Sequence, residues 1–312
     1  MKRLDPFVHL HSHTEYSLFD GISRIGELVS HVKEMGQTAL AITDHGVMYG
    51  AIYLYKECIK QGIKPIIGCE IYVTRGSRFD KSGNGKEKLA HLILLAENNE
   101  GYQNLIKICS KAWTEGYYHR PRADHELLEK YHEGLIVTSA CVGGEVPQAI
   151  LNGDMDEARK VIEFYINTFG KDNYFLEIQN HGLPEEAAVR PVLASLAKEY
   201  GLGLVATNDF HYTKKEDARS QEIKLCISTG KTLDDPYHFH FANDEFYCKS
   251  GDEMRAILGN FPGAIENTRV IADRCNVELT FGEHKLPSFD VPEGETAASY
   301  LRKLCEKALP ER

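Results

Sequence analysis

The chain has 312 residues, of which 42% are hydrophobic and 26% are charged, a composition typical of a globular protein with a sizeable core. Its 36 Lys and Arg residues against 46 Asp and Glu residues give a net charge of −10, which excludes a strongly basic nucleic-acid-binding surface over the whole chain. No apolar run approaches the ~20 residues of a membrane span, and the first residues lack the apolar core of a secretory signal. We therefore expect a cytoplasmic protein whose eight scattered cysteines are reduced.

Short apolar runs alternate with helical patterns along most of the chain. The runs are rich in Val, Ile, Leu or Tyr, as expected of strands that are covered on both faces. They fall at residues 7–11, 38–43, 65–73, 89–95, 134–139, 174–178 and 203–207. Seven repeats of strand and helix favour a parallel sheet closed into a barrel. An open doubly wound sheet is the alternative, because strand order does not follow from this pattern.

Punctuating residues predict several helix boundaries. Ser23 is the expected N-cap of a helix over residues 24–35, and Asp154 is the expected N-cap of a helix over residues 155–169. Proline and acidic residues in the first turn predict a third helix over residues 184–200.

Polar segments interrupt the alternation twice. Residues 75–88 hold five basic and two acidic residues and predict a loop that is either solvated or placed to neutralise a nucleic-acid backbone. Residues 282–296 contain two prolines and several acids and are typical of a linker, after which a helical pattern begins. We expect a barrel domain over residues 1–281, and over 282–312 a linker with the first helix of a following region in a longer protein.

Histidines and acids gather at the ends of the predicted strands. His11 and His13 lie two residues apart, so an extended chain points both to one face, and Asp20 follows on the exit loop. Burying two adjacent imidazoles without a ligand is costly, which favours a metal ion shared by this pair. His9 lies deeper in the strand and is expected to be a hydrogen-bonded core residue.

The other predicted strands carry similar groups. The full set of candidate ligands is His11, His13, Asp20, His45, Glu70, His91, Cys141, Asp209 and His211. Nine groups exceed what one ion can use, so we expect two or three divalent ions, with zinc, manganese or iron favoured by imidazole, carboxylate and thiolate. Glu70 is the natural bridge, because its two oxygens can hold two cations. Closely spaced metals are suited to phosphate-ester hydrolysis.

Six motifs, the first of which spans HLHSHT and SLFDG, occur in an order that resembles a known family. HLHSHT, SLFDG, ITDHG, GCE, HLILLA, SACVGGE and TNDFHY resemble the PHP (polymerase and histidinol phosphatase) superfamily. FVHLHSHTEYSLFDG, PIIGCEIYV, YYHRPR and LPSFDVPEGET are also similar to the N-terminal region of bacterial DNA polymerase III alpha subunits. The resemblance runs from about residue 5 to the last residue. It implies a distorted seven-stranded α/β barrel of the TIM type, with a trinuclear metal site at the C-terminal face of the strands.

The resemblance also implies roles for individual residues. His11, His13, Glu70 and Asp209 correspond to a first metal site, Glu70, His91 and Cys141 to a second, and Asp20, His45 and His211 to a third. Glu70, Asp209 and His211 are then the catalytic ligands, which bridge or activate. The resemblance further implies that residues 282–312 are a linker and the first helix of the polymerase palm region that follows.

The implied activity is a 3′ to 5′ exonuclease that proofreads DNA. Its substrate is a single-stranded primer 3′ end, and its partners are the remainder of the polymerase chain and other replisome subunits. Arg120 and Arg122 are candidate substrate contacts, since aromatic and guanidinium groups together can stack bases and hold phosphates, although residues 113–122 could equally pack on the barrel. His181 is a third candidate, because it lies near the end of a predicted strand. Two other functions stay open: a metal-stabilised scaffold for the polymerase core or a proofreading subunit, and a stand-alone phosphatase of the histidinol-phosphate type.

Overall fold

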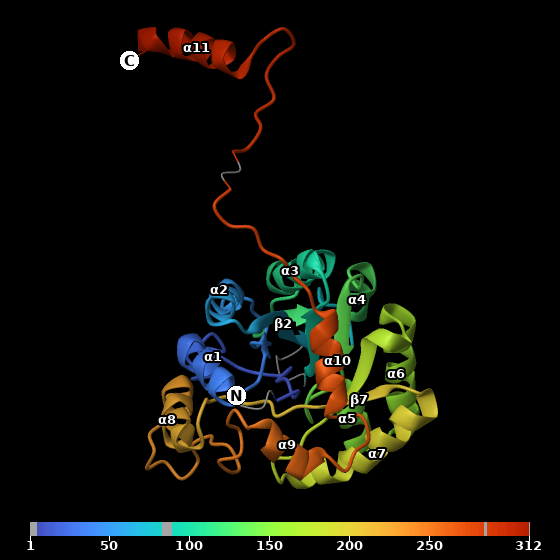
Figure 1. Cartoon of the computed structure of the whole chain (residues 1–312). Helices are drawn as coiled ribbons and strands as arrows, with labels where there is room; N and C mark the ends of the chain where they lie inside the picture. The colour runs from blue at the N-terminus through green and yellow to red at the C-terminus, as the bar shows by residue number, and fades with distance from the viewer. Residues whose placement is uncertain (1–4, 83–88, 284–285, 312) are drawn as a thin grey trace. The chain divides into compact units, whose positions relative to one another are not determined.

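The computed structural model describes residues 5–82, 89–283 and 286–311. The chain divides into two compact units, Met1–Val277 and Glu278–Arg312. In the first unit, helices surround a curled sheet (Figure 1). The first unit covers most of residues 1–281, which we expect to form the barrel domain, and the identity of the region after it stays a prediction.

The sheet of the first unit has seven strands. They are β1 (Ala39–Ile42), β2 (Lys64–Val73), β3 (Ala90–Ala96), β4 (Arg122–Ala123), β5 (Leu135–Thr138), β6 (Tyr174–Ile178) and β7 (Gly203–Ala206). Their order is β1-β2-β3-β5-β6-β7, with β4 paired to β2. The helices are α1 (Ile25–Glu34), α2 (Ala51–Gln61), α3 (Asn99–Thr114), α4 (His125–Lys130), α5 (Glu145–Leu151), α6 (Met155–Phe169), α7 (Pro184–Tyr200), α8 (Ala218–Thr229), α9 (Gly251–Leu258) and α10 (Glu266–Arg274).

The segment predicted as the first strand connects the two edges of this sheet without being a regular strand. Single parallel bridges join His9 to Leu40 on one side and Ser12 to Phe210 on the other. Side chains replace part of the ladder: the amide of Ser12 donates to the hydroxyl of Thr43 at 2.7 Å. The sheet therefore closes as a distorted barrel, which confirms the predicted fold class, while the prediction of a continuous strand at residues 7–11 is wrong.

One strand runs against the predicted parallel direction. β3 pairs antiparallel with both β2 and β5, whereas β1, β6 and β7 make parallel pairs. An antiparallel neighbour needs no crossover helix, and no helix lies between β2 and β3 in the described residues 74–82 and 89. Residues 83–88 of the predicted 75–88 loop lie outside the described residues. The reversal brings the beginning of β3 to the edge where β2 ends.

The helix boundaries follow the predicted punctuation with one exception. The Asp154 side chain accepts from the amide of Glu157 and begins α6, and Gly201 ends α7 in the left-handed conformation. The prediction of Ser23 as the N-cap of α1 is wrong. The N-cap of this helix is Arg24, and it makes no side-chain capping hydrogen bond.

The end of the barrel where the parallel strands begin is closed by α10. Ile271 and Ala272 of this helix belong to the apolar cluster inside the sheet. The amide of Asn267 donates to the carbonyl of Leu204 at 2.8 Å, and Arg269 donates to the hydroxyl of Thr38 at 2.7 Å. α10 therefore covers this end of the barrel and leaves the opposite end, where the parallel strands finish, for a ligand to approach.

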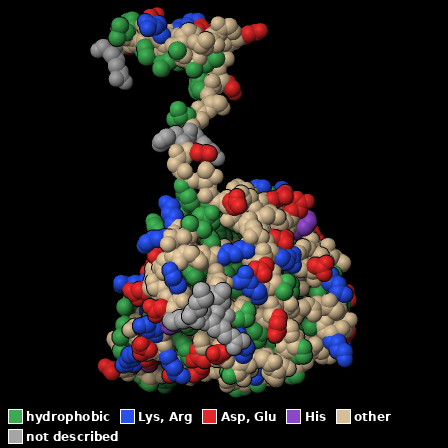
Figure 2. Space-filling model, in the orientation of Figure 1, with side chains coloured by type: hydrophobic (Ala, Val, Ile, Leu, Met, Phe, Trp, Pro, Cys, Tyr) green, Lys and Arg blue, Asp and Glu red, His purple; other side chains and the backbone are tan. Residues whose placement is uncertain are grey.

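The second unit carries one long helix, α11 (Ala297–Ala308), close to the predicted 297–309 pattern. The hydroxyl of Thr296 accepts from the amide of Ser299 and begins this helix. No helix in the described part of the chain is both long and apolar enough to cross a membrane. On the face of the first unit shown in Figure 2, basic and acidic side chains are interspersed rather than segregated.

His9 predicts a measurable acid sensitivity of the fold. Its ring is fully buried and Nε2–H donates to the carbonyl of Lys249 at 2.7 Å, as expected of a core histidine. Burial lowers the pKa of His9 to about 4, so between about pH 6.5 and pH 4 the unfolded chain takes up a proton at this site that the folded chain does not. The stability contribution of His9 is therefore present above pH 6.5 and is lost as the pH falls through this window.

Urea unfolding of the wild type and of His9→Gln between pH 7 and pH 4 tests this. We expect the wild type to be the more stable at pH 7 and its advantage to shrink by up to about 3 kcal/mol at pH 4. The exposed His240→Gln is the control and should run parallel to the wild type. Parallel curves for His9→Gln would contradict the prediction.

Candidate metal centre

The nine predicted ligands converge at the open end of the barrel, although they come from segments far apart in the sequence. Glu70 lies within β2 and His91 near the beginning of the reversed β3. The remaining seven lie beyond the strands: His11 and His13 on the closing segment, Asp20 on its exit loop, and His45, Cys141, Asp209 and His211 after β1, β5 and β7. Three groups of donor atoms each fit within 4.8 Å: His11, His13 and Glu70; Glu70, His91 and Cys141; and His13, His45 and His211.

Glu70 lies at the centre of the cluster. It is 1% exposed, and each of its carboxylate oxygens faces two imidazoles. Oε1 lies 2.8 Å from Nδ1 of His91 and 3.4 Å from Nε2 of His11. Oε2 lies 3.5 Å from Nε2 of His13 and contacts Nδ1 of His45. A carboxylate that faces different imidazoles with each oxygen is arranged to bridge two cations.

Asp209 approaches the same histidines from the end of β7. Its Oδ1 lies 3.0 Å from Nε2 of His11 and 2.9 Å from Nε2 of His13. Nδ1–H of His211 donates to the backbone carbonyl of Asp209 at 2.9 Å, which leaves Nε2 of His211 3.8 Å from Oδ2 of Asp20. Asp209 thus orders one imidazole through its backbone while its side chain faces two others.

Groups outside the cluster fix the proton positions on His11 and His13. Nδ1–H of His11 donates to Oε1 of Glu177 at 2.7 Å. Nδ1–H of His13 donates to the hydroxyl of Ser17 at 3.0 Å, and that hydroxyl donates to Asp44 at 2.8 Å. Nε2 is therefore the nitrogen of each ring that faces the carboxylates, as expected of a histidine that binds metal through Nε2.

These supporting residues were missed by the sequence reasoning. Glu177, the penultimate residue of β6, is 2% exposed and also accepts from the hydroxyls of Thr138 and Thr207 and from Nε2 of Gln179 at 2.9 Å. A carboxylate inside an apolar strand is the same signal that singled out Glu70, and it was present in the sequence YFLEI. Ser17 gave no comparable signal, because its partners are set by the folded loops. Asp44 was visible in the sequence only as an acid at the end of a predicted strand, beside His45.

The neighbouring imidazoles keep the carboxylates of the cluster ionised. Burial alone would raise the pKa of Glu70, but the imidazole of His91 helps to hold it well below its usual value. Burial would likewise raise the pKa of Asp209, and His11 holds it well below its usual value. Burial lowers the pKa of His13 to about 3, so this ring is neutral at neutral pH.

The unsatisfied atoms of the cluster fit a bound cation. Among the described residues, the buried atoms without a hydrogen-bond partner include Nε2 of His11 and His13, both oxygens of Glu70 and Oδ1 of Asp209. A neutral imidazole nitrogen that faces a carboxylate oxygen 2.9 Å away is repelled unless a proton or cation lies between them. The clustered His and Glu residues therefore indicate a divalent metal site.

Backbone strain is concentrated at the same place. In the described part of the chain, the non-glycine residues with positive φ are His119, Ala140 and Asp209, at 61°, 58° and 42°. Ala140 directly precedes Cys141, whose Sγ lies 3.6 Å from Nδ1 of His91. A Cβ atom at Gly143 would lie 3.1 Å from that nitrogen, a tight contact that glycine avoids.

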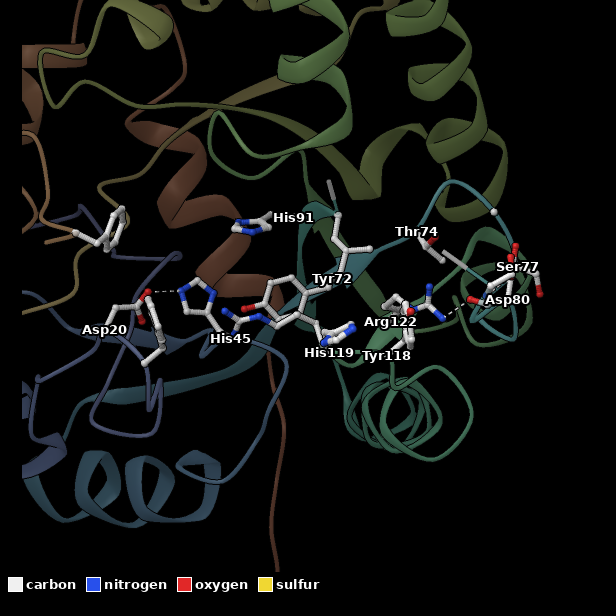
Figure 3. Close-up of a pocket in the computed structure, with 16 residues that line it drawn as sticks. Asp20, His45, Tyr72, Thr74, Ser77, Asp80, His91, Tyr118, His119 and Arg122 are labelled. Carbon is white, nitrogen blue, oxygen red and sulfur yellow. Dashed lines mark hydrogen bonds and ion pairs between the residues drawn. The ribbon is translucent and has the colours of Figure 1, made fainter. Parts of the chain in front are cut away.

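Two grooves lead away from the cluster. The first has a volume of about 670 Å³ and extends from Asp20, His45 and His91 past Tyr72 towards the loop after β2 (Figure 3). The second, of about 410 Å³, shares His45 and Tyr72 with the first. Both are open to solvent and adjoin the metal cluster, so a substrate longer than its reacting group can be held beside it.

The three predicted substrate contacts have different environments. Arg120 is exposed, lines both grooves and lies 5.5 Å from the ring centroid of Tyr72. Arg122 lines the first groove, but its guanidinium is buried and donates to the carbonyls of Arg78 and Asp80. His181 lines neither groove: it is 2% exposed, and its two ring nitrogens bond Glu186 and the Asn208 carbonyl, so its prediction as a substrate contact is corrected to a structural role.

The barrel and its rim of imidazoles and carboxylates define a metal-binding α/β barrel domain. The PHP domain model matches residues 9–181, and the chain belongs to the PHP domain family. The chain is 47% identical over 310 residues to the DNA polymerase III subunit alpha of Thermus aquaticus, covering 96% of this chain and 25% of the relative. It is 46% identical over 308 residues to that of Treponema pallidum, covering 98% and 26%. The resemblance predicted from the motifs is confirmed, and the chain spans about a quarter of these relatives' length.

Solved structures are similar at lower identity. An amidohydrolase from Chromobacterium violaceum is 15% identical with a TM-score of 0.45, over 70% of this chain and 96% of that chain. A putative metal-dependent phosphoesterase from Bifidobacterium adolescentis is 15% identical with a TM-score of 0.42, over 81% of this chain and 95% of that chain.

Glu177 is expected to support metal binding without being a ligand. Glu177→Gln removes the charge that orients His11 and should weaken metal affinity about 10- to 100-fold, measured by isothermal titration with Zn²⁺ or Mn²⁺. Glu186→Gln is the matched control, because Glu186 accepts from the imidazole of His181 in an equally buried pair outside the cluster. Equal metal affinities in the two variants would contradict the supporting role.

Metal occupancy is expected to fall with decreasing pH. The ligand forms are neutral imidazoles and a thiolate, and burial raises the pKa of the Cys141 thiol well above its usual value, so binding must release protons. Elemental analysis after dialysis should show loss of metal as the pH falls below ~6.5. Occupancy that is unchanged between about pH 8 and about pH 5 would contradict imidazole ligation.

Proposed function

We propose that this domain is part of a DNA polymerase III alpha subunit and that it hydrolyses phosphodiester bonds, removing nucleotides from the 3′ end of a DNA strand during replication. The observation that carries this proposal is the convergence of inward-facing acceptors around Glu70. A domain that used metal only to stabilise its fold would need no carboxylate with each oxygen directed at different imidazoles, and no groove open to the cluster.

Within this proposal, nine residues hold two or three divalent ions. We assign His11, His13, Glu70 and Asp209 to the first ion, Glu70, His91 and Cys141 to the second, and Asp20, His45 and His211 to the third. The short distances between each residue and its assigned neighbours support these groups, and Oδ2 of Asp20 lies 3.4 Å from Nε2 of His45. When bound, such ions would supply a nucleophile near neutral pH and stabilise charge on the oxygens of the reacting phosphate.

The protein's own residues would orient the substrate and protect the reaction. Glu177 and Ser17 accept hydrogen bonds from Nδ1 of His11 and His13, so Nε2 of each ring stays directed at the reacting centre. Arg120 lies beside the cluster and can neutralise one phosphate of the strand, since guanidinium groups pair with phosphate oxygens in a defined geometry. Because α10 covers the far end of the barrel, the two grooves at the open end are the proposed route of substrate entry.

The partners follow from the relatives. They are DNA polymerase III alpha subunits about four times as long as the matched region, so we propose the remainder of such a chain as the covalent partner. A single-stranded primer 3′ end would then reach this centre from the polymerase. Nucleotide addition would depend on other residues of that longer chain.

Asp209→Asn tests the proposed function. The variant keeps the shape of the side chain but loses the charge that faces His11 and His13, so trimming of a mismatched primer-template should fall by about 100-fold or more, with reduced metal content. Asp273→Asn, a surface carboxylate on α10 at the closed end of the barrel, is the control and should trim normally. A 5′-labelled primer shows the direction of digestion.

The same assay separates the rival functions. Full metal occupancy with no cleavage of either DNA or p-nitrophenyl phosphate would reject the enzyme hypothesis and support a metal-stabilised scaffold. Cleavage of the small phosphomonoester alone would favour the stand-alone phosphatase.

A further inference from the structure

The second groove is lined by aromatic residues from three separate segments. Tyr16 and Tyr49 lie on the loops after the closing segment and β1, and Trp113 and Tyr117 lie at the end of α3 and just beyond it. Because this groove shares His45 with the first, its aromatic rings begin directly beside the metal centre.

Several of these aromatic side chains are exposed to solvent. Tyr49, Tyr117 and Trp113 are 57%, 47% and 41% exposed. Exposed aromatic surface in one patch costs solvation free energy, and such patches mark binding sites on soluble proteins. The patch therefore calls for a ligand that presents flat apolar faces.

Trp113 and Tyr117 form a rigid stack. Their ring centroids are 5.3 Å apart and their planes differ by 12°. The indole Nε1–H donates to the carbonyl of Gly46 at 2.8 Å, which fixes the Trp113 ring against the residue that follows His45. The pair is thus ordered in advance, and part of its surface stays open to solvent.

The charge of this groove suits an anionic ligand. Among the described residues that line it none is acidic, although the whole chain carries a net charge of −10. Arg120 lines the groove and lies 5.5 Å from the ring centroids of Phe19 and Tyr72. Flat apolar faces together with negative charge are the features of an unpaired nucleotide.

We propose that Trp113 and Tyr117 form a base-stacking platform for single-stranded DNA, with Arg120 contacting the phosphate that links the stacked base to the reacting end. The platform would hold the strand in the second groove and leave the first groove for the terminal nucleotide. This inference rests on the proposed function, since it places the reacting phosphodiester at the metal centre. It adds a binding site for the strand that the ligand cluster does not itself contain.

Trp113 is the only tryptophan in the sequence, so its fluorescence reports on the platform directly. The probe is oligothymidylate, titrated into the 312-residue chain carrying Asp209→Asn to prevent cleavage. We expect saturable quenching of Trp113, and little quenching by an abasic oligonucleotide of the same length. Tyr117→Ala in the same background should weaken oligothymidylate binding roughly tenfold, because base–aromatic stacking contributes that order of affinity.

Matched variants separate stacking from loss of structure. Trp113→Phe should bind a labelled oligothymidylate more tightly than Trp113→Ala, as measured by fluorescence anisotropy, because a ring remains. Tyr200→Ala removes an aromatic residue at the end of α7, outside both grooves, and should bind like its parent. Metal content and circular dichroism of each variant, measured in the chain with Asp209 intact, show whether the fold and centre persist.

The outcomes distinguish this inference from the proposed function. Binding detected by anisotropy without quenching of Trp113, or equal quenching by the abasic strand, would overturn the platform. Equal binding by Tyr117→Ala and its parent would also overturn it. Quenching and tenfold weakening as expected, in a chain whose intact centre cleaves no DNA, would support the platform and reject the proposed nuclease.

Discussion

The burial of one carboxylate governs the rest of this domain. Glu70 lies inside a strand with 1% of its surface exposed, where an isolated negative charge would be strongly destabilising. Four imidazoles from three different segments meet its two oxygens, and Asp209 faces two of the same rings. The barrel brings these segments together. The attraction between imidazoles and carboxylates in turn offsets the cost of burying the charged groups of the cluster.

Much of the fold could be predicted from apolar runs and helix punctuation. The strands other than the first and β4 fall within about two residues of their predicted positions, because buried strands need continuous apolar side chains. The direction of β3 could not be predicted, since it depends on whether a crossover helix forms before it. β4, with two residues, is too short to give a periodic signal. The irregular path of residues 7–11 depends on side-chain bonds such as that from Ser12 to Thr43.

The candidate site was more predictable than its surroundings. Each proposed ligand follows or interrupts an apolar run, and side chains at one edge of a barrel meet whatever the exact strand order. The residues that hold these ligands were harder to find, because Ser17 and Asp44 act through loop geometry. His181 shows the opposite limit: its position near a strand end indicated contact with substrate, yet a neighbouring carboxylate in the folded chain satisfies its ring.

The reversed direction of β3 has a consequence for how this barrel can diversify. A direct connection between antiparallel neighbours contains no crossover helix that must pack on the sheet. Apart from the part held by the buried Arg78, which pairs with Asp124, its length and sequence can therefore change while the ladder that aligns Glu70 with Ile93 keeps its register. Residues of that connection, such as Ser77 and Asp80, form one wall of the first groove. Insertions there could therefore reshape substrate access across homologous chains without moving a single ligand.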